Sequence, residues 1–314
     1  MRIGLNTDSL GALGLDEVLE VAASLELDAV ELPTGAWSPA PHVDLARLLE
    51  SSAARRELLA RVRDRRLEIS ALTCNGNQLD PGSGAEHDRV VRDTIALAPR
   101  LGVERVILMS GCPGGPGDRS ANWITVAWPP EAAAVLRWQW EERVIPYWLD
   151  LVAHARECGV GRLCIEMHGQ QAVYNVPTLL RLREAVGPIV GANYDPSHLM
   201  WMGADPLAAI DALGDAIYHV HAKDTRIEPS VALRSRLETS GDAGERSWNY
   251  VTLGHGHDAS FWRQLCLALQ RVGYDDVLSI EHEDVSMDPL EAVRESVSLL
   301  RRVGEMAPSA SGAA

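Results

Sequence analysis

Four apolar runs in the second half of the 314-residue chain end in ionisable residues. The runs read LCIEMHG, ANYDPSHL, HVHAKD and SIEHED, and each supplies one candidate ligand: Glu166, Asp195, His221 and Glu281. Burying three carboxylates near one another is costly unless a cation neutralises them. Three carboxylates and one imidazole suit a hard or borderline divalent ion with open positions for substrate oxygens. We predict one such ion at these four residues, with Mn2+ as the first choice and Mg2+ or Co2+ as alternatives.

A second interpretation of the same residues is a ring of salt bridges without a metal. Such a ring needs a basic partner for each carboxylate, and only Lys223 and Arg226 lie close by in the sequence. Thiolates are absent from the candidate ligands, which argues against a structural zinc site. The metal interpretation is therefore the stronger one.

These residues need a scaffold that brings the ends of several strands together. Apolar or β-branched runs alternate with segments of helical periodicity at residues 3–7, 29–33, 68–74, 105–111, 162–168, 190–196, 217–224 and 277–284. Strands that alternate with helices pair in parallel, because each crossover helix buries its apolar face on the sheet. Eight such units predict a closed (β/α)8 TIM barrel, with residues 1–306 as one domain and 307–314 as a disordered tail. A doubly wound sheet is the rival architecture, but no G-x-G-x-x-G turn follows the first run.

Two connections are unusually long, from Cys112 to about Glu141 and from Thr225 to about Asp258. Long loops in a compact domain are commonly functional, and those that follow barrel strands lie on the catalytic face. We therefore expect long insertions after strands four and seven, both over the active site. Tryptophans expected to stack on a substrate are Trp123, Trp128, Trp37 and Trp201. Those expected to pack a helix onto the barrel are Trp138, Trp140 and Trp148.

Histidines and one arginine add candidates around the ligand set. His168 follows Glu166 by two residues, so both side chains should face the same side of their strand, which makes His168 a candidate catalytic base. His255 and His257 precede a predicted helix, and their glycine neighbours fit either a close approach to the site or a helix cap. Arg226, just past the seventh strand, is a candidate for holding an anionic or hydroxyl group of the substrate.

The charge and composition of the chain narrow the classes of partner. Lys and Arg total 29 against 44 Asp and Glu, a formal net charge of −15. A surface this acidic repels phosphate backbones and anionic lipid, so we expect neither nucleic-acid nor membrane partners. The five cysteines have no C-x-x-C spacing and are expected to be reduced thiols. The N-terminus reads as a strand rather than a signal peptide, and we expect a cytoplasmic protein.

In combination, the motifs E-M-H, D-P-S-H, H-V-H-A-K-D and S-I-E-H-E-D resemble the xylose-isomerase-like barrel superfamily of sugar isomerases, epimerases and dehydratases. This superfamily is also called the sugar phosphate isomerase/epimerase family. The resemblance covers residues 2–303. It implies that Glu166, Asp195, His221 and Glu281 hold one metal, and that His198 and a residue near Lys223 touch the substrate. In the epimerases of this superfamily two metal-facing glutamates move the proton, here Glu166 and Glu281. An endonuclease branch uses three zinc ions with extra histidines after strands three and four, and residues 72–75 and 109–111 contain none.

The segment after strand four resembles the catalytic α subunits of bacterial C-glycoside deglycosidases more closely than it resembles the simple ketose epimerases of the superfamily. That resemblance implies that His168 is the base acting on a 3-oxo-glycoside, that the aglycone leaves by elimination, and that a small β subunit is a partner. The alternative is an isomerase or epimerase of a free ketose without a partner. In both cases a metal bound to sugar oxygens acidifies the neighbouring C–H, because it stabilises an enediolate. A third hypothesis, a catalytically dead barrel used for binding, predicts that a ligand is missing, and none is.

Overall fold

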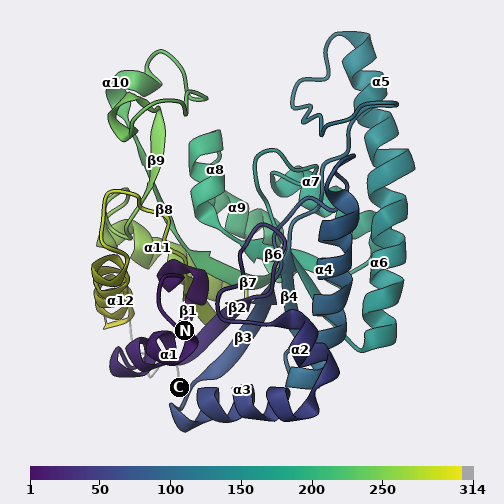
Figure 1. The fold of residues 1–314 in the computed structure, drawn as a ribbon. Helices are drawn as coiled ribbons and strands as arrows, with labels where there is room; N and C mark the ends of the chain where they lie inside the picture. The colour runs from purple at the N-terminus through teal and green to yellow at the C-terminus, as the bar shows by residue number, and fades with distance from the viewer. Residues whose placement is uncertain (306–314) are drawn as a thin grey trace, which may run out of the picture.

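Eight parallel strands close into a barrel in the computed structural model, which describes residues 1–305 (Figure 1). The barrel strands are β1 (Arg2–Asn6), β2 (Ala29–Pro33), β3 (Glu68–Thr73), β4 (Arg105–Leu108), β5 (Arg162–Glu166), β6 (Val190–Tyr194), β7 (Ile217–Ala222) and β10 (Val277–Ile280). Their order around the barrel is β1-β10-β7-β6-β5-β4-β3-β2, and every neighbouring pair is parallel. This closed order confirms the predicted barrel and excludes the doubly wound sheet. Each strand falls within or overlaps one of the eight predicted runs, and seven of the strands end one to four residues before the run does.

Helices cover the outside of the barrel (Figure 1). The α-helices between β1 and β6 are α1 (Leu15–Ser24), α2 (Leu45–Glu50), α3 (Ser52–Asp64), α4 (Gly84–Leu97), α5 (Pro130–Trp138), α6 (Ile145–Cys158) and α7 (Val176–Val186). Those after β6 are α8 (Pro196–Met202), α9 (Pro206–Leu213), α10 (Pro229–Ala232), α11 (Ala259–Arg271) and α12 (Pro289–Glu305). Short 3-10 segments are η1 (Thr7–Leu10), η2 (Ala98–Leu101), η4 (Gly214–Ala216) and η5 (Ala243–Glu245), and η3 (Gln139–Val144) is a π-helical turn that joins α5 to α6.

Local sequence explains where these helices begin and which face they bury. Asp258 accepts hydrogen bonds from the backbone N–H groups of Ser260 and Phe261 and so caps α11, whose Trp262 and Leu265 face the core. Helix α12 starts with Pro289, as its sequence predicts, since proline suits the first helical position. Such apolar faces pack on the strands and build one large core around the barrel.

Inside the barrel the side chains form layers that alternate along each strand. Ala71, Ile107 and Cys164 make a small apolar cluster on the adjacent strands β3, β4 and β5. Two residues further along the same strands, the inward side chains include Thr73 and Glu166, which line a pocket. On these three strands the interior of the barrel is thus apolar in the layer of the cluster and polar one layer above it, at the carboxyl ends of the strands.

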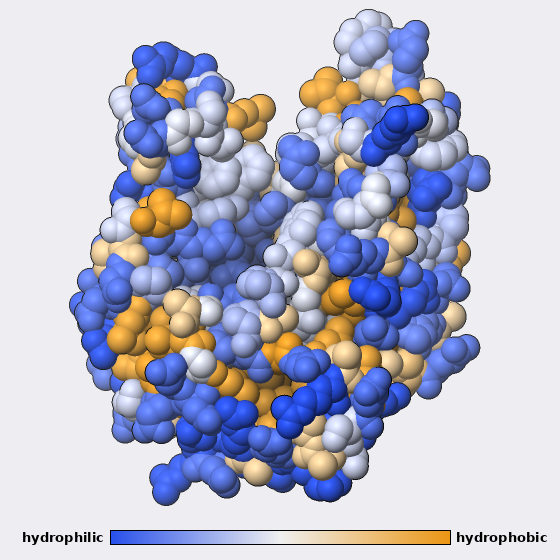
Figure 2. Space-filling view, viewed as in Figure 1, coloured by the Kyte–Doolittle hydropathy of each residue, from blue (hydrophilic) through white to orange (hydrophobic). Residues whose placement is uncertain are grey.

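Two connections rise from this carboxyl end and flank a hollow (Figure 1, Figure 2). Residues 109–129 between β4 and α5 contain no helix or strand. After β7 the chain forms a separate two-stranded antiparallel sheet of β8 (Asp224–Ile227) and β9 (Trp248–Val251), with α10 between them. Both segments lie at the carboxyl end of the barrel in Figure 1, and their role as insertions over an active site stays a prediction. Figure 2 shows hydrophilic residues in the hollow between them.

The remaining predictions about the fold concern tryptophan packing, cysteines and the tail. Trp140 and Trp148 are buried in the core, which confirms their packing role, and Trp138 is half-buried on α5 with Arg143 over its ring. None of the five cysteines, all of which lie in the described residues, forms a disulfide. Across residues 1–305 no helix has the length and apolar character needed to cross a membrane. The predicted disordered tail, 307–314, lies outside the described residues.

Candidate metal centre

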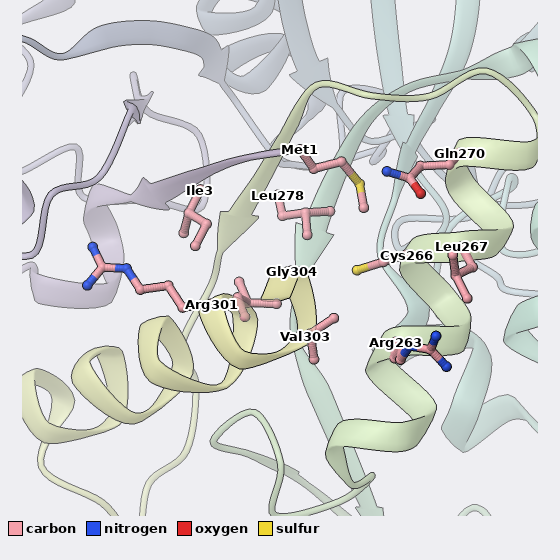
Figure 3. A pocket seen from close by; sticks show the side chains of 11 residues that line it. Met1, Ile3, Arg263, Cys266, Leu267, Gln270, Leu278, Arg301, Val303 and Gly304 are labelled. Atoms are coloured by element: carbon pink, nitrogen blue, oxygen red, sulfur yellow. The ribbon is translucent and has the colours of Figure 1, made fainter. Parts of the chain in front are cut away.

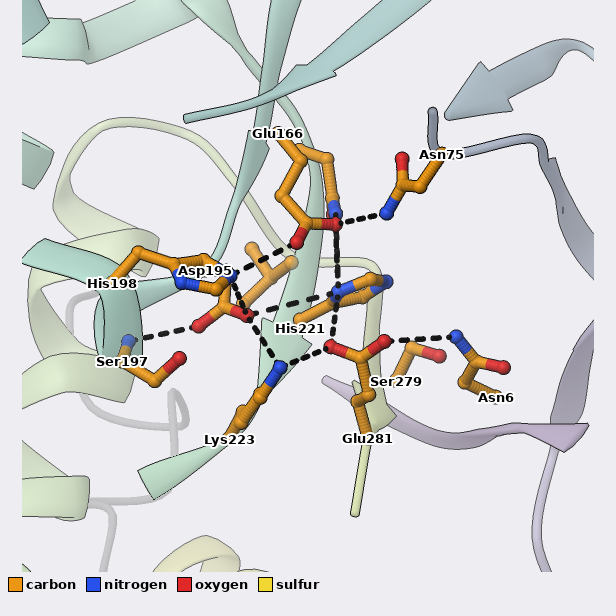
Figure 4. Close-up of polar contacts among 12 residues, drawn as sticks. Asn6, Asn75, Glu166, Asp195, Ser197, His198, His221, Lys223, Ser279 and Glu281 are labelled. Atoms are coloured by element: carbon orange, nitrogen blue, oxygen red, sulfur yellow. Dashed lines mark hydrogen bonds and ion pairs between the residues drawn. The ribbon is translucent and has the colours of Figure 1, made fainter. Parts of the chain in front are cut away.

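The four predicted ligands converge at the carboxyl ends of four consecutive strands of the barrel (Figure 4). Glu166 ends β5, Asp195 directly follows β6, His221 lies on β7 and Glu281 directly follows β10. One ligand atom from each lies within 4.8 Å of the others, and among residues 1–305 this is the one group of acidic, histidine or cysteine side chains with such a geometry. Three of the four are buried, and Glu281 is mostly buried. The arrangement fits one ion with room for substrate oxygens on its open side.

Asp195 shows most directly that this cluster calls for a cation. Its Oδ1 accepts a hydrogen bond from the backbone N–H of Ser197 at the start of α8, at 2.8 Å. Its Oδ2 is buried and accepts no hydrogen bond, although His198 Nε2 lies 3.3 Å away. Burial, together with the neighbouring carboxylates of Glu166 and Glu281, raises the pKa of Asp195 to about 7, although the Lys223 ammonium opposes this. A divalent ion would satisfy the bare oxygen and remove the repulsion.

His221 is held so that one ring nitrogen faces the carboxylates. Its Nδ1 lies 3.2 Å from Glu281 Oε2 and 3.4 Å from Glu166 Oε2. Its Nε2 lies 3.0 Å from Glu31 Oε2 on β2. Burial opposes a charge on this ring, yet the carboxylates of Glu31 and Glu281 raise the pKa of His221 well above its ordinary value. Donation of Nε2–H to Glu31 leaves Nδ1 as the atom that can bind a metal.

Glu31 is one of the site residues that the sequence analysis missed. It is fully buried and accepts hydrogen bonds from Ser279, at 2.8 Å, and from Thr73 and Asn6. His219 lies two residues before His221 on β7, and its Nε2 is 3.3 Å from Glu31 Oε2. Burial lowers the pKa of His219 to about 3. The signal was a single glutamate in the otherwise apolar run AVELP, which forms β2.

Lys223 forms some of the ion pairs that the salt-bridge interpretation requires. Its Nζ lies 3.1 Å from Glu281 Oε2, 2.7 Å from Glu283 Oε1 and 3.9 Å from Asp195 Oδ2. Arg226, the other cation considered, pairs instead with Glu228. The single ammonium of Lys223 therefore faces three carboxylates and cannot neutralise all of them. Despite burial, Lys223 and His221 lower the pKa of Glu281 to about 2, so it is ionised and able to bind a metal.

His198 and His168 lie beside the carboxylate of Glu166. His198 Nε2 is 3.0 Å from Glu166 Oε1, and its Nδ1 is 2.8 Å from the hydroxyl of Tyr250 on β9. Burial, with His168 nearby, lowers the pKa of His198 to about 3, so the neutral ring donates Nε2–H to Glu166 and accepts the Tyr250 proton at Nδ1. The ring of His168 is 4.3 Å from that of His198. Sequence reasoning missed Tyr250, because it lies in a segment interpreted as loop.

A pocket of about 270 Å3 opens above these residues. It is lined by Asn6, Asp8, Pro33, Trp37, Ser38, Pro39, Thr73, Asn75, Met109, Glu166, His168, His198, Lys223, Glu281 and Glu283. Asn75 donates to Glu166 at 2.8 Å, and Asn6 donates to Glu281 at 3.3 Å, so each of the two glutamates is also oriented by an asparagine, one after β3 and one on β1. Of the predicted substrate contacts, His168, His198, Lys223 and Trp37 line this pocket.

The other predicted substrate contacts lie elsewhere. His255 pairs with Glu295, His257 bonds to the buried carboxylate of Asp224, and the side chain of Trp128 is 74% exposed. The remaining three are Arg226 beside Glu228, Trp123 in edge contact with Tyr174, and Trp201 stacked on Trp248 at 4.8 Å. None of these six lines the pocket, so their substrate roles stay predictions without support from its lining. Of the two alternatives for the glycines near His257, a close approach to the site or a helix cap, neither describes their contacts: the backbone N–H groups of Gly254 and Gly256 both donate to Asp224.

A second cavity lies at the amino-terminal end of the strands and offers no comparable chemistry (Figure 3). It is lined by the start of β1, by Leu278 of β10 and by residues of α11 and α12. The side chains around it are mainly apolar, and the cluster able to hold a metal lies at the opposite end of the barrel.

Comparisons with known proteins agree with this architecture. Residues 19–303 match the family described as Xylose isomerase-like TIM barrel. The uncharacterized protein YfiH of Bacillus subtilis (strain 168) is 47% identical over 309 residues, which cover 96% of this chain and 99% of that protein. A D-tagatose 3-epimerase-like protein superposes with a TM-score of 0.64 at 20% identity, covering 97% of this chain and 99% of its own. The IOLI protein, solved with a bound zinc atom, gives 0.67 at 18% identity, covering 98% of this chain and 100% of its own. Likenesses at this identity show the fold.

Proposed function

The chain belongs to the xylose isomerase-like TIM barrel family, and on this premise we propose that it is a divalent-metal-dependent enzyme that moves a proton next to the carbonyl of a sugar. The observation that carries the proposal is the convergence of Glu166, Asp195, His221 and Glu281 below an open pocket. The four donors fit Mn2+, which is our first choice, with Mg2+ or Co2+ as alternatives. The family fold is shared with sugar epimerases, which supports this class of chemistry.

The bound ion would polarise the carbonyl and hydroxyl oxygens of the substrate and so acidify the C–H between them. The chain's own residues then handle the proton. Glu166 and Glu281 come from β5 and β10, which are separated in the barrel by β6 and β7, so they reach the pocket from two sides. Two carboxylates on two sides of a substrate carbon can take a proton from one face and return one to the other, as an epimerase requires.

Hydrogen bonds hold both glutamates in place for this task. Glu166 accepts from His198, Asn75 and Asn193, and Glu281 accepts from Lys223 and Asn6. These donors stabilise the ionised carboxylates, which favours their starting state as bases. We therefore favour isomerisation or epimerisation of a free ketose: the proton leaves one carbon, and a proton is returned to the same or the neighbouring carbon.

Elimination from a 3-oxo-glycoside is the second candidate. In this reaction His168 takes the proton next to the 3-oxo group, and the C–O or C–C bond to the aglycone breaks as the double bond forms. The supporting observation is that His168 lines the pocket with Trp37, whose ring centroid is 6.4 Å away and whose side chain is half exposed. A small β subunit would be the partner in that case, and its co-purification would favour this candidate.

Solvent isotope exchange tests the proposal and separates its two forms. Metal-loaded enzyme in D2O should incorporate deuterium into a ketose, detected by NMR loss of the exchanging C–H signal, and Glu281→Gln should abolish the exchange. A 3-oxo-glycoside should be assayed in parallel for aglycone release with the wild type and His168→Asn. Release that is lost in His168→Asn would select elimination. If protein shown to contain metal gave no deuterium exchange and no aglycone release, the proposed function would be contradicted.

A further inference from the structure

The single lysine of the chain stands out among its basic residues. Lys223 is the only lysine in the 314-residue sequence, and every other basic side chain apart from histidine is arginine. Its side chain is 2% exposed and lines the pocket. A lysine ammonium is a compact point charge, whereas a guanidinium is a wide planar fork. The position therefore selects a small cation at a site where carboxylates crowd together.

The ammonium of Lys223 is already occupied. It donates to Glu281 and to Glu283, at 3.1 and 2.7 Å, and lies 4.3 Å from the centroid of the Tyr250 ring. In Figure 4 it lies between Asp195 and Glu281. An incoming phosphate or carboxylate could reach it only by displacing one of these carboxylates. The one that is neither a metal-ligand candidate nor buried is Glu283, whose side chain is 48% exposed.

Apart from Lys223, no lysine or arginine of residues 1–305 lines the pocket and could attract a bound anion. Among the described residues that line it, Lys223 is the only lysine or arginine, while Asp8, Glu166, Glu281 and Glu283 all contribute carboxyl groups. Even with a divalent ion bound, carboxylates outnumber positive charges there. Asp8 and Glu283 also line a groove that adjoins the pocket. A substrate that extends from the pocket into this groove would therefore meet both carboxyl groups. A charged group at that place would meet like charges, which is an effective way to reject a competing ligand.

We propose that Glu283 is a specificity-determining residue: by engaging Lys223 at the mouth of the pocket, it restricts the enzyme to uncharged polyhydroxylated substrates and excludes phosphate esters and sugar acids. This inference rests on the proposed function, because it names the substrate class of the same site. It assigns to Glu283 no part in metal binding or proton transfer.

Anion binding to metal-loaded protein tests the proposal without any need for turnover. Inorganic phosphate and D-fructose 6-phosphate are titrated by calorimetry into the Mg2+-loaded wild type and into Glu283→Gln. The substitution removes one negative charge and releases Lys223, so both probes should bind at least about tenfold more tightly than to the wild type. The matched control is Glu295→Gln, which removes a carboxylate of similar exposure, 50%, from a surface pair with His255.

Glu295→Gln should bind both probes as weakly as the wild type does. Equal metal content and a melting temperature within a few degrees of wild type would show that Glu283→Gln is folded and loaded, as its half-exposed position leads us to expect. The proposal is overturned if wild type binds phosphate as tightly as Glu283→Gln, or if the two glutamate variants behave alike. Failure of the proposed function would appear separately, as absence of deuterium exchange.

Discussion

The two halves of the barrel contribute differently to the metal centre. Strands β5, β6, β7 and β10 supply the four candidate ligands, whereas β1, β2 and β3, or the residues directly after them, supply Asn6, Glu31 and Asn75, which orient those ligands. Ligands and these hydrogen-bond partners thus come from two different groups of adjacent strands in one closed sheet, and the two groups meet where β1 pairs with β10. From this difference we predict that substitutions in the ligand half weaken metal binding most and that substitutions in the orienting half weaken it less.

The largest expected effect comes from the ligand half. Asp195→Asn keeps the shape of the side chain but removes the charge of a buried carboxylate whose Oδ2 accepts no hydrogen bond. Removing one charged partner from a buried set costs about 3–5 kcal/mol, so metal affinity should fall by about 200-fold to several thousand-fold. Calorimetric titration with Mn2+ measures this. Unchanged affinity would break the comparison at its first half.

A smaller loss is expected in the orienting half. Glu31→Gln keeps an oxygen acceptor for His221 Nε2–H but removes the charge that fixes the ring, so Mn2+ affinity should fall by about 10- to 100-fold. Ser279→Ala is the matched control, because it removes one hydrogen bond to Glu31 and leaves the bond to His221 intact. A loss in Glu31→Gln as large as that of Asp195→Asn would make Glu31 equivalent to a ligand and erase the distinction between the halves.

Metal affinity should depend on pH in a way that involves both halves. The pKa of Asp195 is raised to about 7, so below pH 7 an ion must displace its proton, and this proton alone should lower the metal affinity about tenfold per pH unit. His221, whose pKa is raised well above its ordinary value largely by Glu31, adds a second proton that must also leave. Calorimetry in buffers of different ionisation enthalpy should count about two protons released below pH 7 and fewer above. A pH-independent affinity between pH 6 and 8 would contradict this account.

The smallest expected effect belongs to a residue outside both halves. Tyr250→Phe removes the hydroxyl that donates to His198 Nδ1 and leaves that buried acceptor unsatisfied. Stability should fall by about 1–3 kcal/mol, measured by urea unfolding, while metal affinity should change by less than about threefold. A loss of affinity as large as that of Glu31→Gln would show that the β8–β9 sheet orients the metal ligands as well.

Sequence reasoning located the barrel strands well, because apolar and β-branched runs mark them, and it located the ligands because four successive strand ends carry ionisable residues. It extended most strands too far: the predicted run to Asp284 continues past Ile280, where β10 ends and the chain turns Glu281 into the site. Inward-facing polar residues after a strand look like strand residues in the sequence, although they already belong to the loop.

The residues it missed or misplaced depend on contacts between distant segments. Glu31 is a lone acidic residue on β2, and nothing local shows that His221, 190 residues away, donates to it. His257 and its glycines suggested a functional loop, but the buried partner that they surround is Asp224, a structural carboxylate. Pairings of this kind are set by the closure of the barrel, which no local pattern encodes.

The most direct test of the central claim is an anomalous-scattering measurement on crystals grown with Mn2+. The account predicts one strong peak per chain, about 2.0–2.3 Å from carboxylate oxygens of Glu166, Asp195 and Glu281 and from Nδ1 of His221. A peak coordinated through Nε2 of His221, a peak elsewhere in the barrel, or no peak at saturating Mn2+ would contradict it.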